Sequence, residues 1–297
     1  MSLPLVSVII ATYRRTDSLK NAIKSVLAQD YSNYELIIVD DNADAGWNAK
    51  VTEIVDAAAG NSANVRLIHN HPNQGSAKTR NIGISAAQGE YICFLDDDDV
   101  YLPERLSHQV KDMQDTGADY GITDLILYNE DGTVSSVRRR SYLQGKEKDN
   151  LLLCHLKYFM SGTDTLMFRR EFLTQIGGFG SIDYGDEYYL IMSAIEARGK
   201  LVYSPVCDVR AYVHTGQGGL SSGQAQIDGE NVNYAFRKQY FPQIRSKDRR
   251  YITMRHYAVL AFAYKRSAQP VKFLISGVRS MLTSPLQCLQ MLMTLRI

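Results

Sequence analysis

The sequence predicts an α/β fold in which a mostly parallel sheet carries helices on both faces. Over the first 120 residues, short apolar segments alternate with segments whose apolar residues recur at helical spacing. The short segments are almost continuously apolar, which is typical of strands buried on both faces. The chain has 297 residues, 45% of them hydrophobic, which is enough to build a large core.

Four strands and four helices are expected in this first part. The strands are the apolar runs at residues 5–11, 34–40, 65–68 and 91–96. Thr16 or Asp17 can cap the first helix, and the second includes residues 51–58. Ser76 starts the third helix, which runs to residue 87, and Pro103 suits the first turn of the fourth.

The remainder of the chain has a different pattern. Two extended segments flank an Asn-Glu-Asp-Gly sequence, which is typical of a hairpin turn. The expected elements are extended segments at 122–128 and 133–137, a strand at 163–168, a helix at 188–197, extended segments at 200–204 and 209–214, and helices after Arg245. We therefore divide the chain into residues 1–120, 121–244 and 245–297, the last being a basic, amphipathic, helical tail.

Charge is distributed unevenly along the chain. The net charge is +1, but residues 245–297 hold ten Lys or Arg and one acid, Asp248, giving +9 there and −8 in residues 1–244. This asymmetry indicates a partner for the basic segment. Its helices suit an anionic membrane surface; the alternative is packing on the rest of the chain or in an oligomer. We expect no nucleic-acid partner.

Cysteine usage and the N-terminal sequence bear on location. The four cysteines are scattered, without a Cys-x-x-Cys pair, which fits a reducing compartment. The first residues lack the basic region of a signal peptide, and no run reaches the ~18–20 apolar residues that span a bilayer. We expect a cytoplasmic protein, either free or peripheral on the inner face of the cell membrane.

Polar side chains follow three of the predicted strands directly. They are Thr12-Tyr13-Arg14 after the first strand, Asp40-Asp41-Asn42 after the second, and four aspartates at positions 96–99 after the fourth. In open sheets of this kind, ligands bind beyond the carboxyl ends of the strands. A binding site is therefore expected at this edge of the sheet.

The four aspartates at positions 96–99 suit a divalent metal. Clustered carboxylates repel one another, so an ordered strand end that carries them needs a compensating cation or hydrogen bonds. Oxygen ligands suit Mg²⁺ or Mn²⁺ bound together with substrate phosphates. The alternative is an acidic turn that caps the helix at Pro103.

Asp41 lies at the neighbouring strand end. Its carboxylate can accept a hydrogen bond from the imide NH of uracil, which cytosine lacks. The alternative is an ordinary Asp/Asn turn after a strand.

The sequence over residues 5–200 resembles the family 2 glycosyltransferases. The matching runs are VSVIIATYRR, LKNAIKSVLAQDYSNYELIIVDDNA and NQGSAKTRNIGISAAQGEYICFLDDDD, in the family's order and spacing. The resemblance implies a GT-A (Rossmann-like) fold and a nucleotide-sugar donor, usually linked to UDP. Residues 1–120 would form the nucleotide-sugar-binding half and residues 121–244 the acceptor-binding half.

The resemblance also implies roles for residues on the donor side. Within Ala11-Thr12-Tyr13-Arg14, Tyr13 would pack on the base, and Asp41 would bind it. Asp96-Asp97-Asp98 would be the DxD element, with Asp97 near the ribose and Asp98 on the metal, but four consecutive aspartates leave this register open by one position, so Asp96 is a second candidate ligand. The residues matching the family's Asn-x-Gly and Ala-Arg-Asn stretch are Asn73, Gly75, Arg80 and Asn81. Lys78 and Arg80 can face phosphates; alternatively, Arg80 pairs with a strand-end aspartate.

The resemblance implies an acidic base after Gly177-Gly178-Phe179. Asp186 is the candidate, and Glu187 remains open because this chain has Asp-Glu where Glu-Asp is common. The alternative is an acid that only favours the N-terminus of a helix. His214, in a glycine-rich segment, would complete the metal or diphosphate site; the alternative is a structural or exposed histidine.

These parts suit a single displacement at the anomeric carbon. The metal would stabilise charge on the departing nucleotide, and the base would accept the proton of the acceptor hydroxyl. The acceptor would be a glycan or a lipid-linked intermediate of surface polysaccharide synthesis. A sugar nucleotidyltransferase is disfavoured, because that class has a glycine-rich loop with Lys or Arg after the first strand, and this chain has Ala11-Thr12-Tyr13-Arg14-Arg15 there. A third possibility is an inactive nucleotide-sugar-binding or membrane scaffold protein.

Overall fold

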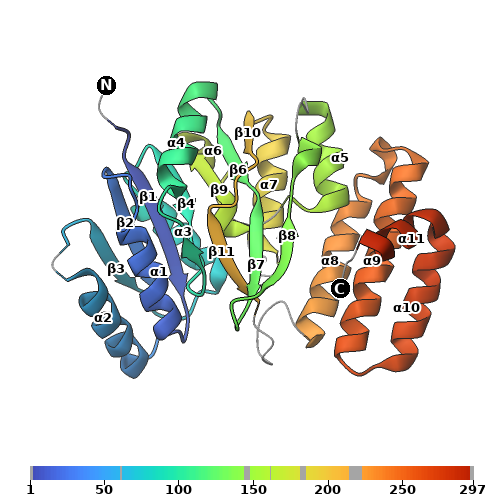
Figure 1. The fold of residues 1–297 in the computed structure, drawn as a ribbon, viewed down its shortest axis with the longest axis horizontal. Helices are drawn as coiled ribbons and strands as arrows, with labels where there is room; N and C mark the ends of the chain where they lie inside the picture. Colours follow the sequence, from blue (N-terminus) through green and yellow to red (C-terminus); the bar gives the residue numbers. More distant parts are fainter. Residues whose placement is uncertain are drawn as a thin grey trace. The chain divides into compact units, whose positions relative to one another are not determined.

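The computed structural model describes residues 3–60, 62–143, 148–160, 162–180, 185–213 and 223–294. The chain forms two compact units, shown in Figure 1. The first comprises Met1–Leu152 and Met160–His214, and the second Leu153–Phe159 and Thr215–Ile297.

A seven-stranded sheet forms the centre of the first unit (Figure 1). Its spatial order is β10 (Leu201–Ser204), β6 (Tyr120–Thr123), β9 (Leu166–Arg169), β4 (Tyr91–Phe94), β1 (Val6–Thr12), β2 (Tyr34–Asp40) and β3 (Val65–His69). All neighbours pair in parallel except β9, which is antiparallel to β4 and β6. The predicted α/β class with a mostly parallel sheet is confirmed.

Helices cover both faces of this sheet because alternate strand residues point to opposite sides. On one face, Val8 and Ile10 belong to a core cluster that also holds Leu19 and Ile23 of α1 (Asp17–Leu27). The same cluster includes residues of α2 (Ala45–Ala59) and α4 (Arg105–Thr116). On the other face, Ile9 lies against α3 (Ser76–Ala86), where a side chain at Gly83 would meet it. The remaining helices of the unit are α5 (Lys148–Tyr158, shared with the second unit), α6 (Arg170–Gln175) and α7 (Asp186–Glu196).

A second, four-stranded sheet has the order β5 (Val100–Tyr101), β11 (Val209–Val213), β7 (Leu125–Asn129) and β8 (Val134–Arg138). The expected continuous segment at 122–128 was wrong, because the chain leaves the large sheet after β6 and enters the small sheet as β7. Asp124 lies between the two strands, and its Oδ1 accepts hydrogen bonds from the backbone N of Arg140 at 2.7 Å and from the Tyr203 hydroxyl at 2.9 Å. These two bonds satisfy the carboxylate at the point where the chain changes sheets.

The strand expected at 163–168 is also shorter than predicted. Residues Thr163–Thr165 form a 3₁₀ turn, and the strand begins at Leu166. This turn brings the buried side chain of Asp164 to the carboxyl end of β4. The sequence pattern could not separate the two, because both are short and no glycine or proline stands between them.

The second unit is helical, as predicted for the segment after Arg245, and it begins earlier with α8 (Gly223–Lys238). The other helices are α9 (Ser246–Arg266), α10 (Pro270–Thr283) and α11 (Pro285–Thr294). A buried carboxylate joins α8 to α9: Glu230 Oε1 lies 2.5 Å from Arg237 Nη2 and 2.9 Å from His256 Nδ1. Among the described residues, no helix is long and apolar enough to cross a membrane.

Gly89 lies where the chain passes very close to β1. A Cβ atom there would lie 2.6 Å from the backbone N of Ser7 and 2.8 Å from the carbonyl oxygen of Leu5. Displacing the backbone of a buried, hydrogen-bonded strand costs free energy. The glycine therefore sets the spacing between the start of β4 and β1.

We predict that Gly89→Ala lowers the free energy of unfolding by about 1–3 kcal/mol, the usual range for overpacking. Urea unfolding followed by circular dichroism measures it. Gly46→Ala, in α2, is the matched control, since its Cβ would meet only Asp44 Oδ1 at an ordinary 3.4 Å. Equal unfolding midpoints for the two variants would contradict the proposed constraint.

Candidate active site

The polar residues predicted at the strand ends come together at the carboxyl edge of β1, β2 and β4. Thr12 Oγ1 donates to Asp97 Oδ2 at 2.7 Å, and the backbone N of Tyr13 donates to the same oxygen at 3.2 Å. The backbone N of Arg14 donates to Asn42 Oδ1 at 2.9 Å. The three clusters that are distant in sequence therefore form one hydrogen-bonded edge.

Asp41 organises the loop that leads into α3. Its Oδ1 accepts from Asn70 Nδ2 at 2.9 Å and from the backbone N of Gln74 at 2.8 Å, and its Oδ2 accepts from the backbone N of Gly75 at 2.9 Å. Asn73 Nδ2 donates to the Asp41 carbonyl oxygen at 2.6 Å. Gly75 has φ of +81°, which favours glycine. Asp41, Asn73 and Gly75 thus belong to one local structure.

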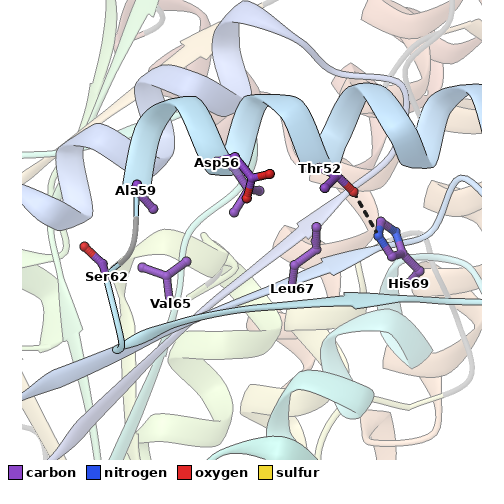
Figure 2. Close-up of a pocket in the computed structure, with 9 residues that line it drawn as sticks. Thr52, Asp56, Ala59, Ser62, Val65, Leu67 and His69 are labelled. Carbon is purple, nitrogen blue, oxygen red and sulfur yellow. Dashed lines mark hydrogen bonds between the residues drawn. The ribbon is translucent and has the colours of Figure 1, made fainter.

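Asp40, next to Asp41, faces a different part of the molecule. Its Oδ2 lies 2.8 Å from His69 Nδ1, and His69 Nε2 lies 3.2 Å from Thr52 Oγ1. Thr52 and His69 border a hollow of about 260 Å³ between α2 and β3. Figure 2 shows the residues that line it. None of the predicted site residues lines this hollow, so it is separate from the candidate site.

Asp97 and Asp98 are paired with Arg15, which the sequence analysis did not assign to the site. Arg15 Nη2 lies 2.7 Å from Asp98 Oδ2, and Arg15 Nε lies 3.5 Å from Asp97 Oδ1. Burial, followed by the charge of Asp98, raises the pKa of Asp97 to about 7. The arginine therefore balances only part of the negative charge at this strand end.

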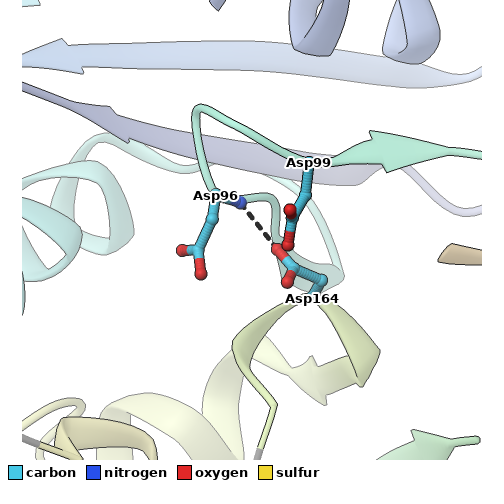
Figure 3. Close-up of side chains that lie close together, drawn as sticks. All are labelled: Asp96, Asp99 and Asp164. Carbon is cyan, nitrogen blue, oxygen red and sulfur yellow. Dashed lines mark hydrogen bonds between the residues drawn. The ribbon is translucent and has the colours of Figure 1, made fainter. Parts of the chain in front are cut away.

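Asp96, Asp99 and Asp164 form the group best suited to a cation. One oxygen from each carboxylate lies within 4.8 Å of the others (Figure 3). The backbone N of Asp96 donates to Asp164 Oδ1 at 2.6 Å, and the backbone N of Tyr212 donates to Asp99 Oδ1 at 2.9 Å. Burial and the charge of Asp96 raise the pKa of Asp164 to about 7, and burial and Asp164 raise the pKa of Asp99. This oxygen-only, undercompensated set fits Mg²⁺ or Mn²⁺.

Asp164 was not predicted, and a buried arginine beneath it was missed as well. Arg105 Nη2 donates to the Asp164 carbonyl oxygen at 2.7 Å, and Arg105 Nε lies 3.5 Å from Asp208 Oδ1. Both side chains of this ion pair are buried. They hold the turn at Asp164 against the strand end, and their only signal in the sequence is an isolated charge in an apolar context.

Arg80 joins the acidic cluster to the candidate base. Its Nη2 lies 2.6 Å from Asp96 Oδ1 and its Nη1 lies 2.5 Å from Asp186 Oδ2, while Ser76 Oγ donates to the same Asp186 oxygen at 3.3 Å. The two carboxylates raise the pKa of the Arg80 guanidinium further, against the effect of burial. This pairing with a strand-end aspartate is the alternative considered for Arg80. Lys78, on the same helix, is exposed.

The Gly-Gly-Phe segment is held by Asn81. Asn81 Nδ2 donates to the Phe179 carbonyl oxygen at 2.8 Å, and the backbone N of Phe179 donates to Asn81 Oδ1 at 2.9 Å. Gly178 has φ of +66°, and a Cβ there would lie 2.5 Å from Asn81 Oδ1. Phe179 packs edge-on against Phe94, with ring centroids 5.0 Å apart. The Gly-Gly-Phe segment therefore contacts the Arg80-Asn81 stretch directly.

Asp186 and Glu187 start α7 at the edge of this cluster. Asp186 is buried, and its Oδ1 accepts from the backbone N of Glu187 at 2.7 Å. Burial, followed by the charge of Asp186, raises the pKa of Glu187 to about 8. The other predicted residues are placed as follows: Ala11 and Thr12 end β1, Tyr13 is 48% exposed, and His214 lies outside the described residues.

The fold and this site are those of a glycosyltransferase of the GT-A type. Residues 7–177, more than half of the chain, match the model of glycosyl transferase family 2, and the chain belongs to that family.

Curated relatives include the putative colanic acid biosynthesis glycosyl transferase WcaA of Escherichia coli, 46% identical over 104 residues. An uncharacterized glycosyltransferase of Haemophilus influenzae is 28% identical over 251 residues, and the match covers 83% of this chain and 93% of that protein. The succinoglycan biosynthesis protein ExoO of Rhizobium meliloti is 30% identical over 214 residues. The chain spans 36% of WcaA and 59% of ExoO, and these matches cover 35% and 68% of this chain.

Two solved structures share the fold at 14% identity. S. aureus TarS 1-349 in complex with UDP-GlcNAc has a TM-score of 0.60, covering 92% of this chain and 90% of that one. The mannosyltransferase PcManGT of Pyrobaculum calidifontis, in complex with GDP-Man and Mn²⁺, has a TM-score of 0.58, covering 95% and 88%. Together with the family match, they confirm the predicted GT-A fold.

We predict that Arg80→Met, without added metal, lowers the free energy of unfolding by about 3 kcal/mol, because two carboxylates lose their shared cation. Saturating Mn²⁺ should recover part of this loss by balancing Asp96. Urea unfolding with chelator or with Mn²⁺ measures both effects. The control is Arg66→Met, which removes a half-exposed pair with Glu35 worth about 0–1 kcal/mol. If Arg80→Met cost no more than this control, the bridge would not be structural.

Proposed function

We propose that the protein transfers a sugar from a nucleotide-diphosphate donor, in particular a UDP-sugar, to an acceptor hydroxyl with inversion at the anomeric carbon and with a divalent metal. The observation that carries this proposal is the cluster of strand-end carboxylates, joined through Arg80 to an acidic pair at the start of α7. Such a site can balance a diphosphate through a metal and accept a proton a short distance away.

The acceptor we propose is a glycan or a lipid-linked intermediate of surface polysaccharide synthesis. Support comes from relatives whose names refer to colanic acid, succinoglycan and teichuronic acid biosynthesis. The UDP-GlcNAc in TarS and the GDP-Man with Mn²⁺ in PcManGT support a nucleotide-sugar donor and a metal for this fold. Exposed Tyr13 can pack on the base of such a donor, beside Asp41.

The residues proposed to hold Mn²⁺ or Mg²⁺ are Asp96, Asp98, Asp99 and Asp164, with His214 as a further ligand. When bound, the metal would neutralise the charge that grows on the departing diphosphate. Asp98 would have to exchange its contact with Arg15 for the metal. Arg15 would then be free to pair with a phosphate, as its position after β1 allows.

We propose that Asp186 and Glu187 have different roles when the proton of the acceptor hydroxyl is removed. Asp186 Oδ2 already accepts hydrogen bonds from Arg80 and Ser76, so this oxygen is occupied by donors of the protein. Burial and the charge of Asp186 outweigh the attraction of Arg80 and raise the pKa of Glu187 to about 8, which suits acceptance of a hydroxyl proton near neutral pH. Glu187 is therefore the favoured base and Asp186 the group that positions it.

We predict that kcat/KM rises with pH, is half-maximal near pH 8 and levels off above about pH 9, because the base must be deprotonated and its pKa is about 8. Glu187→Gln should remove this dependence and lower kcat/KM by at least about 100-fold. Asp186→Asn should move the inflection to lower pH, because Asp186 contributes to the raised pKa of Glu187. The opposite pattern, with the inflection lost only in Asp186→Asn, would assign the base to Asp186.

We predict that the wild-type protein slowly hydrolyses a UDP-sugar when Mn²⁺ is present and that Asp98→Ala lowers this turnover by more than about tenfold without unfolding the protein. Asp164→Asn should have a similar effect. The control is Asp115→Ala, which changes an exposed aspartate on α4 that pairs with Lys111.

Nearly normal turnover of the Asp98 variant would remove that residue from the metal site. A thermal-shift panel of UDP-, GDP- and dTDP-sugars with and without Mn²⁺ tests the donor directly. No shift and no hydrolysis with any of them would favour an inactive binder. Pyrophosphate release from a nucleoside triphosphate and a sugar phosphate would indicate a nucleotidyltransferase.

A further inference from the structure

We propose that the outer face of α10 and α11 docks on an anionic lipid bilayer. The face, here called the α10–α11 face, consists of ten exposed apolar residues: Val271, Leu274, Ile275, Val278, Met281, Leu282, Leu286, Leu289, Leu292 and Met293. Both helices are drawn in red in Figure 1. The inference rests on the proposed acceptor class, since a lipid-linked acceptor lies at a membrane surface. Its test requires neither a sugar donor nor a metal.

The exposed apolar residues of α10 recur at helical spacing. On α10, residues 271, 274, 275, 278 and 282 follow the i, i+3, i+4, i+7 pattern that places side chains on one side. Leu282 and Leu286, on either side of the break between the helices, are each 77% exposed. An exposed apolar surface of this extent marks an interaction site.

The inward side of α10 shows that this exposure is built into the unit. Ser276 and Ser280 are buried, and Ser280 Oγ donates to the Met254 carbonyl oxygen of α9 at 2.9 Å. Cys288 of α11 is buried beside it, with Sγ 3.5 Å from that hydroxyl. The helix therefore buries its serines and exposes its leucines, the reverse of the usual pattern for a helix in water.

Charge at the edge of the face selects a lipid surface as the occupant. No acidic residue follows Asp248 in the sequence. Lys272 and Arg279 are exposed and lie over the rings of Tyr264 and Tyr257, at 5.5 and 5.7 Å. Cations beside an apolar helix face suit anionic head groups above acyl chains. Two copies joined through this face would instead bring like charges together.

The structure narrows the segment expected to contact a membrane. The sequence placed it anywhere in residues 245–297, including the apolar run of α9. In that run Ala258, Leu260, Ala261 and Ala263 are buried, so α9 supplies the support for α10 and α11. The contact is assigned to α10 and α11 only.

Co-sedimentation of the full chain with vesicles tests this assignment. We expect pelleting with mixed phosphatidylcholine–phosphatidylglycerol vesicles, weaker pelleting with pure phosphatidylcholine, and a decrease at high salt. Leu282→Glu/Leu286→Glu should reduce pelleting by about tenfold or more, since both changes put charge into the apolar face. The matched control is Val134→Glu/Val137→Glu, which adds the same charges at exposed apolar residues of β8.

Circular dichroism and the melting temperature of each variant establish that it is folded. Equal pelleting of the two double variants would overturn the proposal. So would a wild-type protein that ignores both kinds of vesicle but forms a dimer that Leu282→Glu/Leu286→Glu dissociates, because the face would then join two copies. Since Asp98→Ala should pellet like the wild type, loss of the transfer chemistry and loss of membrane docking are distinguishable.

Discussion

The site depends on keeping several carboxylates together at one edge of the sheet. Four consecutive aspartates end one strand, and Asp164, Asp186 and Asp208 add charge from other elements. Like charges at such distances are unfavourable unless cations or backbone donors offset them. Three arginines supply the cations: Arg15 at the surface, Arg80 across the centre and Arg105 in the interior. Burial and neighbouring carboxylates raise the pKa values of Asp97, Asp99 and Asp164, so the arginines offset only part of this charge, and a divalent metal would offset more of it.

The first part of the fold could be predicted from the sequence because it depends on local pattern. Continuous apolar runs predicted β1 to β4, and the polar residues after them predicted the edge that carries the candidate site. Parallel pairing brings these strand ends together whatever the loops do. Hence Thr12, Asp41 and Asp97 could be assigned to one place without a structure.

The rest of the site depends on contacts between distant parts of the chain. Asp164 is an isolated aspartate in a short turn, and Arg105 lies within an amphipathic helix. Arg15 follows Tyr13, which was expected to pack on the base of the nucleotide. Nothing in their local sequence separates them from surface charges. The same limit applies to α10: its apolar periodicity was visible, but only the burial of Ser276 and Ser280 shows which side faces outward.

The chain changes sheets at Asp124, and the parts on either side tolerate changes in length differently. The predicted site residues after β1, β2 and β4 follow strands of the large sheet, where a change in length would disturb the register of several strands. The hairpin of β7 and β8 is exposed along β8 and ends in a turn at residues 129–133, so insertions there would leave the large sheet unaltered. The length of this hairpin can therefore vary between related chains while the strand ends that carry the carboxylates keep their geometry.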